Sequence, residues 1–204
     1  MRLLLAERHS RDVSAHARMS ARLTTLPTRE SIEIDTWDTH DLAAAEPAGG
    51  YAGATSAAPD VPVPPGAMAN RLHTLAAALE RCERAGTSVA VIDPALVTAD
   101  AALLRLLDDP SLVAAALVGG PADEHPVATY GANVLAVGTQ LHPIEGADTE
   151  FLGALYLHRS VLPQARSAII RALDAETPEW DALDAVDLLL TILVRSASDG
   201  VPAV

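Results

Sequence analysis

Short apolar runs alternate with segments of helical periodicity along most of this chain. The runs are typical of buried strands, and they cover Leu3–Ala6, Thr87–Asp93, Leu112–Val118 and Phe151–Leu157. Apolar residues at steps of three and four predict helices between and after them, over Asp12–Leu26, Ala67–Ala85, Asp100–Asp108, Val161–Asp174 and Pro178–Ser196. This order predicts an α/β sandwich with a mostly parallel sheet.

Further strand patterns refine that prediction. Ser31–Trp37 alternates apolar and polar residues, and Val127–Tyr130 and Asn133–Val137 follow each other without a helix between them. Two successive strands of this kind predict an antiparallel edge. Residues 38–66 lack a pattern and are rich in Gly and Pro, so we expect a long flexible loop there. With 204 residues and 50% apolar content, the chain should form a single domain over residues 1–204.

Two absences limit what the first strand can bind. The chain contains no lysine, and its first glycine is Gly49. The junction after the first strand reads Arg8-His-Ser-Arg-Asp12, whereas phosphate sites at such junctions use glycines so that the backbone can approach the ligand. A P-loop, which needs a Gly-Lys pair, is therefore excluded.

Net charge limits the partners that this chain can bind, and cysteine content indicates the compartment in which it works. The net charge is −13, which disfavours nucleic-acid binding because no basic patch offsets repulsion from phosphates. The single cysteine, Cys82, cannot form an internal disulfide, in keeping with a reducing compartment. The amino-terminal apolar run is too short for a signal segment, and no run reaches membrane-spanning length. We expect a cytoplasmic protein.

Asp93 is the first candidate site residue. It comes at the end of a buried strand, where α/β sheets bind ligands, and its carboxylate could hold Mg²⁺ against phosphates. The alternative is that Asp93-Pro94 only begins a turn. His142, between two strand candidates, could contact a ligand or transfer a proton, although a loop histidine is more often structural. No metal-binding pair of histidines and no nucleophile elbow is present.

The last predicted helix carries a polar stripe and a wide apolar surface. Asp181, Asp184 and Asp187 lie three residues apart and continue to Thr191, which favours a solvated face over a ligand site. The rest of the helix is apolar, so it is either buried on several sides or meets a partner, most simply in a homodimer.

Several stretches resemble a known family. Val89–Leu103, with its strand, Asp93 and following helix, is similar to sugar-phosphate nucleotidyltransferases. Leu104–Pro110, Phe151–Leu157 and Asp184–Ser196 resemble the nucleotidyltransferase-like (GT-A-like) domain that precedes a CDP-alcohol phosphatidyltransferase membrane domain in actinobacterial proteins. The resemblance covers roughly residues 68–196. It implies a three-layer α/β/α fold of the nucleotide-diphospho-sugar transferase kind, with Asp93 at the Mg²⁺ position.

The resemblance leaves three functions open. Because Arg8–Asp12 departs from the family's glycine-rich loop with Arg and Lys, the leading interpretation is a degenerate domain that binds, regulates or assembles in CDP-alcohol phospholipid metabolism. Its partners would be a nucleotide or sugar/alcohol phosphate and a membrane-embedded phosphatidyltransferase, at the inner face of the membrane. The second is an active Mg²⁺-dependent nucleotidyltransferase that forms an NDP-activated alcohol or sugar, with Arg8 or Arg11 replacing the lysine. The third is a structural dimerisation domain.

Overall fold

A computed structural model describes most of the chain: residues 1–6, 13–29, 31–37, 67–121, 125–138, 144–174, 185–197 and 200–204. Arg8, Arg11 and His142 lie outside these ranges, as does the whole of the loop expected over residues 38–66. The candidate contacts at these three residues therefore stay predictions.

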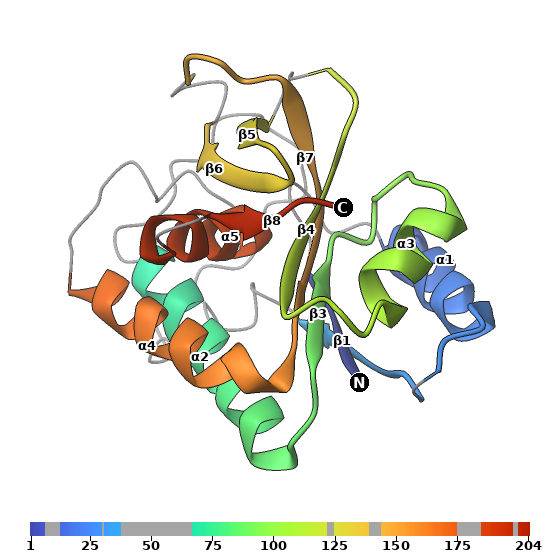
Figure 1. Ribbon diagram of the computed structural model, residues 1–204. Helices are drawn as coiled ribbons and strands as arrows, with labels where there is room; N and C mark the ends of the chain where they lie inside the picture. The colour runs from blue at the N-terminus through green and yellow to red at the C-terminus, as the bar shows by residue number, and fades with distance from the viewer. Residues whose placement is uncertain are drawn as a thin grey trace, which may run out of the picture.

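Helices and strands follow in the order that the sequence predicts (Figure 1). The strands are β1 (Arg2–Ala6), β2 (Glu33–Trp37), β3 (Val89–Ile92), β4 (Ala114–Gly119), β5 (Pro126–Tyr130), β6 (Asn133–Val137), β7 (Thr149–Leu157) and β8 (Val201–Pro202). The helices are α1 (Val13–Thr25), α2 (Ala67–Ala85), α3 (Asp100–Asp108), α4 (Leu162–Leu173) and α5 (Ala185–Ser196), with a 3-10 turn at Arg159–Val161. Of the described helices, none combines the length and hydropathy needed to cross a bilayer.

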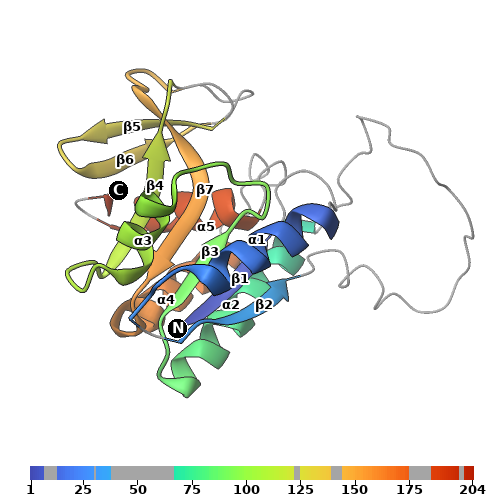
Figure 2. The same ribbon diagram turned by 90° about the vertical axis from the view of Figure 1, so that its right-hand side faces the viewer.

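All eight strands form one mixed sheet in the order β2-β1-β3-β7-β5-β6-β8, with β4 paired to β7. β1 pairs in parallel with β2 and β3, whereas β7 runs antiparallel to β3, β4 and β5. Strands β1 to β4 therefore point the same way, and β7 passes between β3 and β4 in the opposite direction. The β5–β6 hairpin lies at the other end of the sheet from β1 and β2 (Figure 2).

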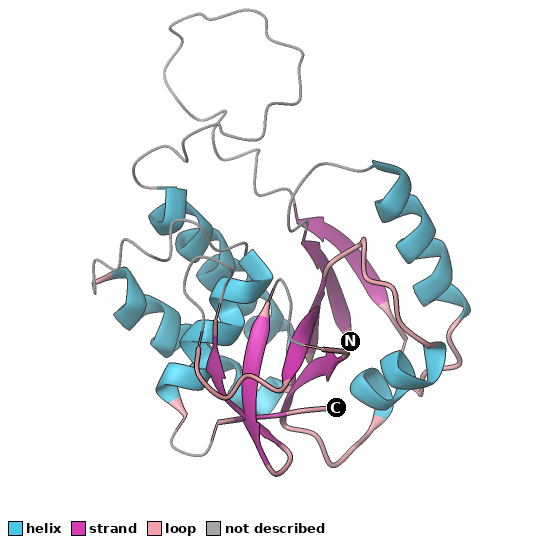
Figure 3. Cartoon of the chain, turned by 90° about the horizontal axis from the view of Figure 1, so that it is seen from above, coloured by secondary structure: helices cyan, strands magenta, loops and turns pink. Residues whose placement is uncertain are grey.

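Helices cover both faces of the sheet, so the predicted three-layer α/β/α fold is confirmed. Helices α2, α4 and α5 pack on one face, and α1 and α3 on the other (Figures 1 and 3). Along β1, Leu4 belongs to the first of these cores, and Leu3 and Leu5 belong to the second. Both sides of each central strand are thus removed from water, which explains why these strands are continuous apolar runs.

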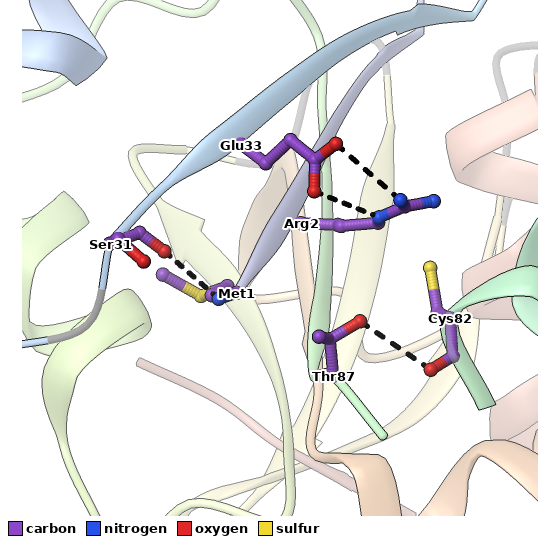
Figure 4. A network of polar contacts seen from close by, with 6 residues as sticks. All are labelled: Met1, Arg2, Ser31, Glu33, Cys82 and Thr87. Atoms are coloured by element: carbon purple, nitrogen blue, oxygen red, sulfur yellow. Dashed lines mark hydrogen bonds and ion pairs between the residues drawn. The ribbon is translucent and has the colours of Figure 1, made fainter. Parts of the chain in front are cut away.

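Polar contacts fix the amino ends of β1 and β2 (Figure 4). The amino group of Met1 donates a hydrogen bond to the carbonyl of Ser31 at 3.0 Å. Next to it, Nε of Arg2 lies 3.2 Å from Oε2 of Glu33 in an ion pair across the two strands. These contacts set the register of β1 and β2 at their amino ends. A ligand site is expected at the opposite, carboxyl ends of the parallel strands.

Helix α5 is buried around most of its circumference, and the prediction of a solvated stripe is wrong for Asp187 and Thr191. Both are buried, and the Thr191 hydroxyl donates to the Asp187 carbonyl at 2.8 Å. The reason is that α5 contacts β6, β7, α2 and α4. Asp181 and Asp184 lie outside the described residues. Most of the described apolar side chains of α5 are buried by this chain itself, and Leu193 is half-buried. They do not require a second copy, and the homodimer stays a prediction.

A short carboxyl-terminal strand, which the sequence pattern does not predict, joins β4 to β6. β8 pairs antiparallel with β6. Beyond it, the Val204 N–H donates to the Ala116 carbonyl at 2.9 Å, and the Val204 carbonyl accepts from the Val118 N–H at 3.1 Å. The last residues of the chain therefore fill the space between two strands that do not pair with each other.

Candidate functional site

Asp93 lies directly after β3, at the carboxyl ends of the parallel strands β1 and β3. Its residue surface is only 8% exposed. The backbone N–H of Asp93 donates to the carbonyl of Gly153 at 2.7 Å, which continues the β3–β7 ladder by one residue. This is the position that the sequence predicts, at the sheet end where open α/β folds bind ligands.

The carboxylate of Asp93 also shapes the turn that follows. Its Oδ1 accepts a hydrogen bond from the N–H of Ala95 at 2.9 Å, and the Leu96 N–H donates to the Asp93 carbonyl at 3.0 Å. The side chain thus mimics a backbone turn, as Asp commonly does where a strand ends. The turn alternative considered for Asp93 is therefore present in the structure.

A bulge in β7 lies next to Asp93. Between the pairs Ala116–Leu155 and Val118–Phe151, β4 advances by two residues while β7 advances by four. Gly153 lies within this bulge with φ of 88°, a conformation that side-chain-bearing residues rarely adopt. Bulges are frequent near functional sites, where they re-aim neighbouring groups. Here the bulge presents the carbonyl that holds the Asp93 backbone.

His125, the residue before β5, lies at the same edge of β7 as Asp93. β3 pairs with the Ala154–Leu157 part of β7, and β5 pairs with Thr149 and Glu150. The two strands therefore follow each other end to end along β7. Between them, Asp93 bonds to Gly153, and the Phe151 N–H donates to the His125 carbonyl at 2.9 Å. Asp93 and His125 flank the junction, two β7 residues apart.

His125 is paired with a buried carboxylate of α5. Its Nδ1 lies 3.3 Å from Oδ1 of Asp187, and the two side chains are 12% and 2% exposed. Sequence reasoning did not predict this pair, because Asp187 fits a polar stripe and His125 precedes a strand far away in the chain. A buried carboxylate is costly to desolvate unless it is paired, and His125 supplies one close polar contact to Asp187.

Asp148 is an ionised carboxylate just before β7, five residues before Gly153. The Thr129 hydroxyl donates to its carboxylate at 2.7 Å. This hydrogen bond is the main cause that holds the pKa of Asp148 below its ordinary value, so the group is ionised at neutral pH.

The described residues fit Mg²⁺ only in part. Among them, no group of three or more His, Cys, Asp or Glu side chains is arranged to hold a metal ion. Mg²⁺ at nucleotide sites is commonly bound by one or two carboxylates together with phosphate oxygens and water. Asp93 offers one such carboxylate, so it would hold Mg²⁺ only when ligand phosphates supply further oxygens. When bound, the ion would neutralise phosphate charge.

A hollow lies away from this site. A cavity of about 250 Å³ opens between α4, α5 and the start of β8. The residues that line it, among them Leu157, Ala165 and Leu193, include no ionisable side chain. A phosphate or metal ligand is not expected there.

Two substitutions of Asp93 separate its roles in metal binding and in the turn. Asp93→Asn keeps an oxygen that can accept from Ala95, so we expect the melting temperature to change little while Mg²⁺-dependent ligand binding is lost. Asp93→Ala removes that oxygen as well, and should lower the free energy of unfolding by about 1 kcal/mol. Thermal melts and ligand titrations measure the two effects. Normal Mg²⁺-dependent binding by Asp93→Asn would remove Asp93 from the site.

Comparisons with known proteins give distant structural likenesses only. The sequence matches no family model, and no curated protein matches it. The inositol-1-phosphate CTP transferase from T. maritima has 11% identity and a TM-score of 0.38, covering 57% of this chain and 44% of that one. The CTP:phosphocholine cytidylyltransferase from Streptococcus pneumoniae has 13% identity and a TM-score of 0.41, covering 66% and 54%. A UTP-bound UGPase from Acinetobacter baumannii has 12% identity and a TM-score of 0.42, covering 99% and 68%.

The chain spans about half the length of the first two of these proteins. With identities of 11–13% and TM-scores below 0.5, the likeness is no basis for assigning an activity, a ligand or a site residue.

Proposed function

We propose that this chain is a degenerate nucleotidyltransferase-like domain that binds a nucleotide or a sugar or alcohol phosphate at the carboxyl ends of β1 and β3. The observation that carries the proposal is the buried Asp93 carboxylate after β3, beside the β7 bulge. It stands where an α/β sheet binds ligands, and one of its oxygens is engaged by the Ala95 N–H. The Asp93 carboxylate would hold Mg²⁺ together with ligand phosphates.

The composition of the site predicts weak ligand binding and inefficient nucleotidyl transfer. The chain has no lysine, and no glycine before Gly49 allows the backbone close to a phosphate at the first strand–helix junction. Arg8, Arg11 and His142 are proposed as ligand contacts in place of that loop. A single carboxylate and long arginine side chains position a reacting phosphate less firmly than a glycine-rich cradle does.

The binding would serve a regulatory or assembly role in CDP-alcohol phospholipid metabolism. This part of the proposal is supported by the sequence resemblance over Leu104–Pro110, Phe151–Leu157 and Asp184–Ser196. The partner would be a membrane-embedded phosphatidyltransferase, with this domain held at the inner face of the membrane. A ligand-dependent change in the association of the two proteins is the behaviour expected of such a module.

Nucleotide affinity tests the proposal. We expect CTP, UTP, ATP or GTP with Mg²⁺ to bind with Kd of about 1 mM or weaker, equivalent to about −4 kcal/mol. Isothermal titration calorimetry at high protein concentration measures this. A micromolar Kd for any of them would favour an active nucleotidyltransferase that forms an NDP-activated alcohol or sugar. No binding of any of the four at tens of millimolar would favour a structural domain.

A further inference from the structure

We propose that the cavity between α4, α5 and the start of β8 is a binding site for a neutral, unbranched aliphatic molecule, namely a primary alcohol of medium chain length. The site lies apart from Asp93, so the inference does not rest on the proposed function. It comes from the size of the cavity, from the uncharged side chains that line it, and from the contrast between its buried floor and its exposed mouth.

The cavity is larger than an ordinary packing defect. Protein interiors are close-packed and contain few voids larger than one water molecule. This cavity has a volume of about 250 Å³, whereas an apolar cavity of about 150 Å³ is large enough to bind benzene. A methylene group takes up about the volume of a water molecule, roughly 30 Å³, so the cavity has room for an alkyl chain of roughly eight carbons.

Small side chains create the cavity where α4 and α5 lie side by side (Figure 1). Five of the residues that line it are alanine or glycine, namely Ala114, Ala165, Ala168, Ala197 and Gly200. Larger apolar side chains complete the wall, and these are Leu157, Val161, Leu193 and Val201. Ala165 and Ala168 lie three residues apart and so share one face of α4. Their methyl groups leave open the space that leucine side chains would fill.

The lining selects against charged ligands. Its polar side chains are those of Gln164 and Ser196, and neither is ionisable. In the orientation that satisfies its amide, Gln164 donates to the carbonyls of Ser160 and Val161 at 3.1 and 3.2 Å, so its NH₂ group is engaged by its own helix end. A carboxylate or phosphate inside the cavity would lose its hydration without gaining an opposite charge. The net charge of −13 disfavours anions further.

Burial divides the lining into a floor and a mouth, which orients the ligand. The buried lining residues, which form the floor, are Leu157, Ala165, Ala168 and Val201. The exposed lining residues, which form the mouth, are Gln164, Ser196 and Ala197. The mouth is also the carboxyl end of α5, where a helix carries partial negative charge and favours a hydroxyl donor over a carboxylate. The alkyl chain would lie on the floor, with the hydroxyl group at the mouth.

Titration of the full chain with a series of primary alcohols tests this inference, with backbone amide NMR as the readout. The probes are 1-butanol, 1-hexanol and 1-octanol. We expect the amides of α4 and of the carboxyl end of α5 to shift, and the affinity to rise about fourfold with each added methylene group. Octanoate, which has the same chain length as 1-octanol but carries a negative charge, should bind about tenfold more weakly or worse.

Two substitutions block the cavity in different ways. Ala168→Leu fills the floor, so it should keep or raise the melting temperature and weaken 1-octanol binding about tenfold or more. Ser196→Trp covers the mouth from an exposed position and should weaken binding as well. Ser167→Leu is the matched control, because it adds a leucine to α4 at an exposed residue outside the lining and should bind as wild type.

Three results would overturn the inference. One is the absence of any saturable shift of these amides with 1-octanol up to its solubility limit. Another is wild-type affinity for 1-octanol in Ala168→Leu and Ser196→Trp, and the third is equal affinity for octanoate and 1-octanol. Should Ala168→Leu not fold, Ser196→Trp decides by itself, since its side chain adds no volume to the core. Nucleotide binding at Asp93 is measured separately, so failure of this inference leaves the proposed function untouched.

Discussion

Replacing Gly200 by alanine is expected to lower the free energy of unfolding by about 3 kcal/mol or more. Gly200 has φ of +77°, and a Cβ at this position would lie 2.2 Å from the Val134 carbonyl oxygen and 3.0 Å from its carbon. Both atoms belong to the backbone of β6, which is held between β5 and β8. The substitution therefore adds dihedral strain and pushes β8 out of the sheet. Urea denaturation measures the loss.

Gly146→Ala is the matched control for the backbone conformation alone. Gly146 has a similar φ of +75°, but a Cβ there would meet nothing within 4 Å. We expect this variant to lose only about 1 kcal/mol, the ordinary cost of a left-handed residue with a side chain. Equal losses for the two variants would show that the contact with Val134 does not matter.

Phe151→Ala is expected to cost about 3–5 kcal/mol, the usual range for a buried aromatic residue replaced by alanine. Phe151 is the only phenylalanine of the chain and is fully buried in the core on the α5 side of the sheet. With so few aromatic residues elsewhere, neighbouring aliphatic side chains must fill the cavity it leaves. Chemical denaturation with urea measures the change.

Phe151→Leu provides the comparison, because it keeps most of the apolar volume. We expect a loss of about 1–1.5 kcal/mol for this variant. Both variants retain the backbone N–H at position 151 that bonds to the His125 carbonyl. The folded fraction of each variant should therefore bind ligand with similar affinity. A loss below 1 kcal/mol for Phe151→Ala would contradict the packing described here.

Most of the fold can be predicted from the sequence because its strands are covered on both faces. Apolar runs such as Val89–Ile92 cannot be confused with exposed strands, and the helices α2 and α3 have the predicted bounds. The order in which the strands pair in the sheet could not be predicted in the same way. Local pattern does not reveal that β7 passes between β3 and β4, because strand order depends on contacts between residues far apart in the chain. β8, with two residues, carries no periodicity at all.

The candidate site was predictable only where it lies at the end of a strong pattern. Asp93 follows a continuous apolar strand, so its place at the sheet end could be inferred. His125 and Asp187 could not be joined from sequence, because their proximity depends on α5 packing against the strands that follow β4. Helical periodicity placed Asp187 on a polar stripe and so indicated exposure, but the surrounding elements bury that stripe in part. Tertiary packing overrode the amphipathic pattern.

The bridging position of β8 has a consequence for the order of folding during synthesis. Residues 200–204 supply the only described backbone pairing between β4 and β6, and their partners Ala116 and Val134 lie far earlier in the chain. Pairings of high sequence separation form late, since long loops must close first. The ladder that joins β4 to β6 therefore forms only after residues 200–204 have been synthesised. Before these residues dock, the edges of β4 and β6 that they cover are unpaired, and unpaired strand edges can pair with other chains and aggregate.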